Sequence, residues 1–468
     1  MLFSSPSFLY YFLPIALILY FITPMPKGSP RLRNVTLLVM SLVFYAWGEP
    51  RYVFLMIAQC VFAWGFGLLI DKHRGQKAAK TLMLISVVIS LSGLIYFKYA
   101  NFFISNVNNL TNSNIAFIRF VMPIGISFYT FQLLSYTIDL YRGLIRVSRN
   151  VLDFSTYVAS FPQLIAGPIV RYSDIEAALS KREHSFSRFA MGSRRFIIGL
   201  GKKMLIANMF GELVAIYKVS GDESVLFVWL YLIAYTMQIY FDFSGYSDMA
   251  IGLGHIFGFK FPENFNYPYI ADSITNFWRR WHMTLSGWFR DYVYIPLGGN
   301  RVKVLRHVFN IMLVWMLTGF WHGADWNFIL WGGYFGVVLL VEKLFLGKAL
   351  RKAPKAVRHI YVILIVFISW AFFDALGFNE AFTVIGRMFG AGGTLASREA
   401  LYYLRSYAVP LVIAVIGSTP LIMKLAQKID TKKRLVVVLE PVVLLLILIV
   451  STASMVDGSF NPFIYFRF

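Results

Sequence analysis

The sequence is poor in charged residues, and above all in acidic ones. Charged residues make up 14% of its 468 residues, with 23 Asp and Glu against 44 Lys and Arg, whereas a soluble domain carries about 25%. Hydrophobic residues reach 58%. This balance excludes an ordinary soluble fold. The net charge of +21 does not indicate nucleic-acid binding, because the basic residues lie in short loops between apolar runs, as in membrane proteins that fix their orientation.

Cysteine is almost absent. Cys60 stands alone inside an apolar run, so it has no partner for an internal disulfide and contributes to no metal cluster. The histidines are scattered and form no His-x-x-x-His pair. The sequence also lacks a Gly-Lys-Ser/Thr phosphate-binding loop and a Gly-x-Ser-x-Gly nucleophile elbow. We therefore expect no metal site and none of the chemistry that these two motifs support.

Long apolar runs are what the sequence has in excess. A bilayer core about 30 Å thick is crossed by about 20 helical residues. Runs near this length occur at 8–26, 35–48, 52–70, 81–99, 119–140, 196–217, 224–241, 305–321, 326–346, 357–377, 405–424 and 434–453. They predict an all-α polytopic membrane protein with about 11–13 membrane helices, the shorter ones tilted or re-entrant. The run 8–26 lacks a basic segment before it and a cleavage site after it, so we expect a retained helix.

Loop charges predict the orientation of the chain. Basic clusters follow the first, third and fifth runs, at 27–33, 72–80 and 142–149. The positive-inside rule places these loops in the cytoplasm and the N-terminus outside. The basic segment 171–203 belongs to the same side, so 152–170 must enter and leave through one face.

Pro162, Gly167 and Pro168 interrupt the segment 152–170, and we predict that it is re-entrant. The sequence has no internal repeat. The simplest organisation is one membrane domain over 1–468, with a catalytic core at about 119–346 and C-terminal helices at 350–468.

Residues 238–332 differ from the rest of the chain in carrying chemically reactive side chains. His322 lies between two apolar runs, and about 15 helical residues after the basic loop advance the chain roughly 22 Å into the membrane. Ionisable residues at that depth are costly and by default mark a function, and His is suited to proton exchange near neutral pH. The alternative is a neutral His hydrogen-bonded between helices, with Asp325 or a backbone carbonyl as partner. Gly319 and Gly323 favour function, because they allow close approach of backbone or ligand.

His282 lies in an aromatic and basic segment. Phe277, Trp281, Leu285 and Trp288 recur at helical spacing, which predicts an amphipathic helix at or near the interface. An orientation helix with aromatic anchors would explain this pattern without catalysis. The candidate residues for holding an anionic, phosphate-bearing ligand here are Arg279, Arg280 and Arg290, flanked by Trp278 and Trp281. Positive-inside charge is the competing explanation for each arginine.

Two carboxylates, Asp242 and Asp248, lie in or beside the end of an apolar run. Carboxylates at membrane depth need partners. Tyr and Ser residues nearby in the sequence could donate hydrogen bonds to them, so structural pairing is the favoured interpretation.

Several strings of this sequence, taken together, resemble the membrane-bound O-acyltransferase family. They are Met1-Leu-Phe-Ser-Ser5, Phe97-Lys-Tyr-Ala-Asn-Phe102, Pro123-Ile-Gly-Ile-Ser-Phe-Tyr129, Leu164-Ile-Ala-Gly-Pro168, the 238–332 block and the C-terminal 461–466. Trp278-Arg-Arg-Trp-His282 combined with Trp321-His322-Gly323 is the most specific part. The similarity covers most of the first 345 residues.

The resemblance implies an all-helical fold in which a cytoplasmic funnel meets an extracytoplasmic one. It implies that His322 is the invariant catalytic histidine and His282 the second polar catalytic position. It further implies acetyl transfer from a cytoplasmic thioester, acetyl-CoA, across the bacterial inner membrane to an extracytoplasmic acetyltransferase partner that modifies an exopolysaccharide. Alginate and cellulose are the leading polymers, and peptidoglycan or another glycan stays open. We expect a longer C-terminal portion in an alginate enzyme.

Two other functions compete with this one. A D-alanyl transferase for teichoic acid shares the implied fold and would take its acyl group from a carrier protein. A non-enzymatic transporter of polysaccharide or lipid carrier is the second. Transporters often show paired halves with broken helices, and no such symmetry is visible here.

Overall fold

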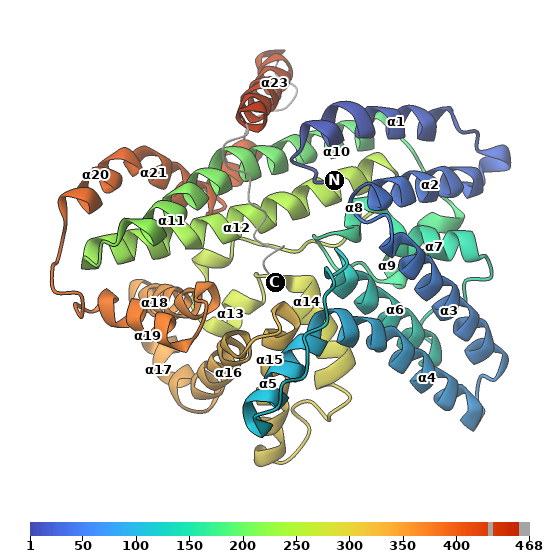
Figure 1. The fold of residues 1–468 in the computed structure, drawn as a ribbon. Coiled ribbons are helices and arrows are strands. Elements are labelled where there is room, and N and C mark those ends of the chain that lie inside the picture. Colours follow the sequence, from blue (N-terminus) through green and yellow to red (C-terminus); the bar gives the residue numbers. More distant parts are fainter. Residues whose placement is uncertain (429–433, 458–468) are drawn as a thin grey trace. The chain divides into compact units, whose positions relative to one another are not determined.

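The computed structural model describes residues 1–428 and 434–457, and within them the chain is helical and without a strand (Figure 1). A chain in lipid must satisfy its backbone polar groups internally, and helices do so within each segment. The predicted all-α polytopic fold is confirmed. The C-terminal string at 461–466 lies outside the described residues.

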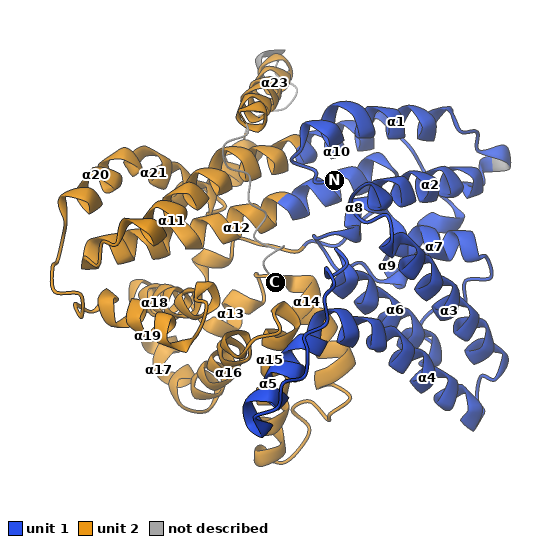
Figure 2. Cartoon of the chain, in the orientation of Figure 1, with its two compact units in different colours: residues 1–196, 246–263 blue, residues 197–245, 264–468 orange. Residues whose placement is uncertain are grey.

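The chain divides into two compact units (Figure 2). Unit 1 comprises Met1–Phe196 and Tyr246–Glu263, and unit 2 comprises Ile197–Gly245 and Asn264–Phe468. Two helices, α10 (Phe186–Gly201) and α12 (Val225–Ile256), begin in one unit and end in the other. The catalytic core expected at 119–346 stays a prediction.

Unit 1 is held together by aromatic packing. Its other helices are α1 (Leu13–Ile22), α2 (Arg31–Gly48), α3 (Tyr52–Lys72), α4 (Lys77–Leu94), α5 (Ala100–Thr111), α6 (Ile126–Tyr141), α7 (Val151–Ala159), α8 (Phe161–Leu164) and α9 (Tyr172–Ser180). The rings of Phe8, Phe12, Phe44 and Phe161 lie 5.2–6.1 Å apart in stacked, tilted and edge-to-face pairs. Such arrangements suit the quadrupole of aromatic rings.

The segment expected to be re-entrant contains α7 and α8, separated at Ser160. At 1.5 Å per residue α7 is about 14 Å long, less than half a bilayer core. Pro162 lies in the first turn of α8, where its missing N–H costs no helical hydrogen bond. A segment of two short helices is compatible with re-entry, which stays a prediction.

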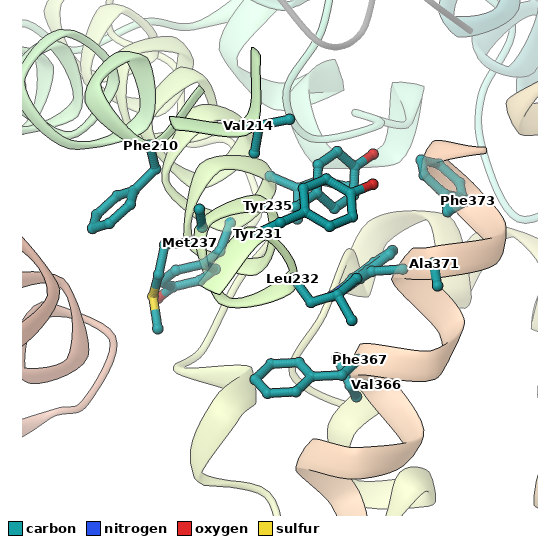
Figure 3. Close-up of a cluster of buried hydrophobic side chains, with 14 of the residues drawn as sticks. Phe210, Val214, Tyr231, Leu232, Tyr235, Met237, Val366, Phe367, Ala371 and Phe373 are labelled. Atoms are coloured by element: carbon teal, nitrogen blue, oxygen red, sulfur yellow. The ribbon is translucent and has the colours of Figure 1, made fainter. Parts of the chain in front are cut away.

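Unit 2 carries the remaining helices. They are α11 (Asn208–Ser220), α13 (Ile274–Trp278), α14 (Met283–Phe289), α15 (Val304–His322), α16 (Trp326–Val341), α17 (Gly347–Lys352), α18 (Lys355–Asp374), α19 (Phe378–Met388), α20 (Arg398–Ser406), α21 (Ala408–Gly417), α22 (Leu421–Gln427) and α23 (Arg434–Val456). Its core joins α11, α12, α13, α16 and α18. Figure 3 shows Leu232 of α12 lying against Phe367 and Ala371 of α18.

Seven helical spans in the described residues are long and apolar enough to cross a bilayer. They are Tyr52–Lys72, Lys77–Thr111, Val225–Ile256, Val304–His322, Trp326–Lys352, Lys355–Asp374 and Val437–Val456. The pair α20 and α21, bent by 54°, would make an eighth. The sequence led us to expect about 11–13. Part of the difference lies in 119–140, where Pro123 and left-handed Gly125 leave only the 16 residues of α6 in the helix.

α15 and α16 form a tightly packed helical hairpin through glycine. A Cβ atom on Gly319 would overlap the carbonyl oxygen of Phe328, and one on Gly332 would overlap that of Trp315. Small residues let membrane helices approach to backbone contact. Gly319, which the sequence suggested as room for backbone or ligand, is therefore occupied by the backbone of α16. This hairpin fixes the end of α15, where His322 lies.

We predict that Gly332→Ala destabilises the protein by about 1–3 kcal/mol or more, because the added methyl overpacks the contact with Trp315. The measurement is thermal unfolding of the purified protein in detergent. The matched control is Gly333→Ala on the same helix, where a Cβ meets nothing within 4 Å. That variant should be neutral or gain up to about 1 kcal/mol of helix propensity. Equal effects of the two changes would contradict the tight packing.

Candidate active site

His322 is the last residue of α15, 18 residues after Val304, and therefore roughly 27 Å along the helix axis. Its side chain is buried, and aromatic rings enclose it. The ring centroids of Trp321, Trp331 and Phe373 lie 5.0, 5.3 and 5.5 Å from that of His322, each nearly perpendicular to it. Asp325, the partner considered from the sequence, is exposed at the start of α16.

His282 lies directly before α14, in a left-handed conformation with φ of +43°. Its side chain is 1% exposed. Nδ1 lies 3.0 Å from Oδ1 of Asn264, and Nε2 is buried without a hydrogen-bond partner among the described residues. A non-glycine residue at positive φ costs free energy, and such strain concentrates at functional positions. The cost here is offset by the buried contact with Asn264.

The amphipathic helix expected around His282 is not continuous. α13 ends at Trp278 and α14 begins at Met283, so the chain breaks at 279–282. Helical spacing could not reveal this break, because the apolar residues on both sides of it are buried. Phe277, Trp281, Leu285 and Trp288 are all buried. The break turns the imidazole of His282 towards α15, with its ring centroid 6.0 Å from Trp321 and 6.5 Å from His322.

A pocket of about 710 Å³ lies in unit 2, and neither His282 nor His322 is among the residues that line it. Its lining includes Thr318, one turn before His322, and Trp278 and Leu285, which flank His282 in the sequence. Five cationic side chains line it, namely Arg279, Arg290, Lys343, Arg351 and Arg358, together with the carboxylates Asp272 and Glu342. The net positive charge suits an anionic ligand.

Three of the five residues predicted to bind a ligand line this pocket, namely Trp278, Arg279 and Arg290. Arg280 does not, because it donates to Oδ1 of Asn276 and to the carbonyl of Asn266. Trp281 is buried in the core, with its ring 5.3 Å from that of Trp370. The alternation of aromatic and basic side chains could not separate these two residues from the pocket residues. Their role in ligand binding stays a prediction.

Sequence reasoning missed Lys343, Arg351 and Arg358. They lie more than 50 residues beyond the Trp278–His282 motif, and they resemble ordinary loop charges. It also missed the role of Glu342. This buried carboxylate accepts the backbone N–H groups of Ile274 and Thr275 at the start of α13. A carboxylate at a helix N-terminus satisfies free N–H groups and complements the helix dipole. The sequence did offer one signal for this role, which is a Glu within an apolar run.

Asp242 and Asp248 are both paired, as the sequence favoured, but with cations. Asp242 lies 2.7 Å from Nζ of Lys203, and both side chains are buried. Asp248 accepts from Arg195, which also binds Glu263. In the described residues no group of three or more His, Cys, Asp or Glu side chains could hold a metal ion.

Burial among uncharged groups lowers the pKa of His282 to about 3. In the unfolded chain its pKa is about 6.5. Below pH 6.5 the unfolded state therefore binds a proton that the folded state does not, and stability falls as pH falls. At pH 5 this costs about 2 kcal/mol.

We predict that wild type loses more thermal stability than His282→Gln when the pH is lowered from 7.5 to 5. The measurement is the unfolding temperature of both proteins in detergent at the two pH values, and the other histidines cancel in the comparison. Parallel losses would mean that His282 is protonated in the folded state.

Comparison with known proteins identifies the family of this chain. The model of the membrane-bound O-acyltransferase family matches residues 142–384, more than half of the chain, including both histidines and the pocket. The chain is 39% identical to the probable alginate O-acetylase of Azotobacter vinelandii, over 100% of both chains. It is 35% identical to the peptidoglycan O-acetyltransferase of Helicobacter pylori, over 86% of this chain and 83% of that protein.

The teichoic acid D-alanyltransferase of Bacillus subtilis is 33% identical, but over only 47% of this chain and 59% of that protein. The chain resembles named enzymes over its whole length. An enzyme is therefore a simpler interpretation than a non-enzymatic transporter. The chain belongs to the membrane-bound O-acyltransferase family, and it is a multi-pass membrane acyltransferase.

Proposed function

We propose that this protein transfers acetyl groups from acetyl-CoA in the cytoplasm across the bacterial inner membrane for O-acetylation of an exopolysaccharide. The observation that supports this most directly is the pair of buried imidazoles beside a cationic pocket. The similarity to a probable alginate O-acetylase over the full chain favours an acetyl group and an alginate-type polymer. Cellulose is the alternative polymer, and an extracytoplasmic acetyltransferase would complete the delivery.

The pocket suits the phosphate-bearing part of acetyl-CoA. Arg279, Arg290 and Arg351 present guanidinium groups, whose planar donors bind phosphate oxygens in pairs. Arg290 already contacts Asp291, and Arg358 contacts Asp272, so these two cations are oriented before a ligand binds. The pocket reaches Thr318, one helical turn from His322, so the thioester end would approach the imidazoles.

His322 would act as general base on the acceptor hydroxyl, or as a nucleophile that carries the acetyl group. His282 would orient the acyl group or act on its carbonyl. The rings of Trp321, Trp331 and Phe373 around His322 would keep water from hydrolysing the acetyl group. Any mechanism at this site transfers the acyl group from sulfur to oxygen and releases a thiol.

We predict that His322→Ala lowers acetyl transfer from radiolabelled acetyl-CoA by about 100-fold or more, because proton transfer or nucleophilic attack is lost. The acceptor is deacetylated alginate oligosaccharide, supplied with the purified protein and its extracytoplasmic partner. Retention volume and unfolding temperature establish that the variant folds. Activity near that of wild type would end the catalytic proposal.

A second prediction concerns the donor. Arg351→Ala should raise the KM for acetyl-CoA several-fold with little change in kcat, because a phosphate contact is lost while the imidazoles are untouched. Lys348→Ala is the control, since Lys348 carries the same charge on the same helix α17 but does not line the pocket. Equal KM values for the two variants would argue against phosphate binding in this pocket.

The D-alanyl alternative makes a different demand. Its donor is a carrier protein, so free acetyl-CoA would neither bind nor label the protein or an acceptor. Incubating wild type with radiolabelled acetyl-CoA, and separately with a D-alanyl-loaded carrier protein, distinguishes the two donors.

A further inference from the structure

Oδ1 of Asn264 is surrounded by hydrogen-bond donors. It accepts the hydroxyl of Thr284 at 2.8 Å and the backbone N–H of Thr284 at 3.4 Å, and it lies 3.0 Å from Nδ1 of His282. A backbone N–H can only donate, so the atom facing these groups is the amide oxygen and not the amide nitrogen. The side chain of Asn264 is fully buried. Its orientation is thus fixed by the backbone it touches.

This contact determines which nitrogen of His282 carries the proton. An amide oxygen has no proton to donate, so Nδ1 must donate to it. In a neutral imidazole the other nitrogen then carries a lone pair. That nitrogen, Nε2, is buried and has no hydrogen-bond partner among the described residues.

The surroundings of His282 keep its ring neutral. Four rings face it, with centroids 4.7–6.5 Å away. They belong to Phe243 of α12, Phe265 of the loop between α12 and α13, and Trp321 and His322 of α15. His322 is the titratable group among these neighbours, and no charged side chain is found in the described contacts of the ring. Burial therefore lowers the pKa of His282 without a compensating charge.

Asn264 is also held through its backbone. Its backbone carbonyl oxygen accepts the backbone N–H of Met283 at 2.9 Å, which ties it to the start of α14. A group that sets a tautomer must be immobile, and this contact restrains it.

We propose that Asn264 is a positioning residue that holds His282 as the Nδ1–H tautomer, so that Nε2 accepts the proton during acyl transfer. This inference rests on the proposed function. It replaces the expectation that His282 polarises the acyl carbonyl, because polarisation requires a donor and Nε2 of this tautomer carries none. The assignment gives His322 the role of nucleophile.

The proton then follows a closed path. Nitrogen of His322 attacks the thioester carbon, an N–C bond forms and the C–S bond breaks. The proton released from the acylated imidazole passes to Nε2 of His282 and on to the leaving sulfur, which departs as a thiol. In the second half the acceptor hydroxyl gives its proton to Nε2 while its oxygen attacks the acetyl carbon. The C–N bond breaks, and His282 returns the proton to His322.

The test is the pH profile of acetyl transfer by the purified full chain with its partner, acetyl-CoA and deacetylated alginate oligosaccharide. Asn264→Ala should lower kcat by about 10- to 100-fold, with little change in the KM for acetyl-CoA. Asn264→Asp keeps an acceptor for Nδ1–H but adds a negative charge, which raises the pKa of His282. This variant should recover activity at high pH, with the acid limb of its profile moved upward by about one pH unit or more.

Asn310→Ala is the matched control for loss of a buried amide. Asn310 is also fully buried and donates to the carbonyls of Leu297 and Gly299, away from the histidines. This variant should unfold at a lower temperature but keep the pH profile of wild type and the kcat of the folded fraction.

The outcomes separate the two proposals. If wild type transfers no acetyl group from acetyl-CoA, the proposed function fails. If wild type is active and His322→Ala is inactive, but Asn264→Ala keeps the kcat and pH profile of wild type, only the role of Asn264 fails. If Asn264→Ala does not fold, Asn264→Asp decides, because an unmoved acid limb overturns the inference.

Discussion

The enclosure of two imidazoles by aromatic rings is the constraint on which the rest of this structure depends. Charge is expensive in such surroundings, so burial lowers the pKa of His282 and keeps its imidazole neutral. The rings come from α15, α16 and α18, and the closeness of α15 and α16 requires glycine where the helices touch. The packing of the unit 2 helices therefore creates the apolar environment in which the imidazoles lie.

Charge is placed beside this enclosure and not inside it. The cations of the 710 Å³ pocket come from the segments directly after α13 and α14, from the segment before α17, and from α17 and α18. Two of them are paired with carboxylates, which holds them in place at the cost of part of their charge. A polar ligand can therefore bind outside while its reactive end meets an apolar environment, where electrostatic effects on a reaction are strongest.

Ion pairs that include a buried carboxylate have a different role in this fold. Lys203 and Asp242 face each other in the interior of unit 2, and Lys218 pairs with Asp374 beside the ring of Phe373. Such pairs add little net stability, because desolvation offsets their attraction, but breaking one leaves an uncompensated charge. The first pair constrains how the helical segment Lys202–Ala207 lies against α12, and the second constrains how α11 lies against α18. Carboxylates in an apolar run were visible in the sequence, whereas their cationic partners were not.

The sequence by itself determined the membrane class and the helical fold, because hydropathy is a local property of the chain. It also singled out the two histidines as candidates for catalysis. It also determined three of the pocket residues, through their place beside His282. Only the tertiary structure decided that the chain breaks at 279–282, that Asn264 meets His282, and that Arg351 and Arg358 join Arg279. The residues that meet at His282 or share the pocket lie 18 to 79 positions apart in the sequence. No local pattern encodes such separations, because packing of the whole unit brings the residues together.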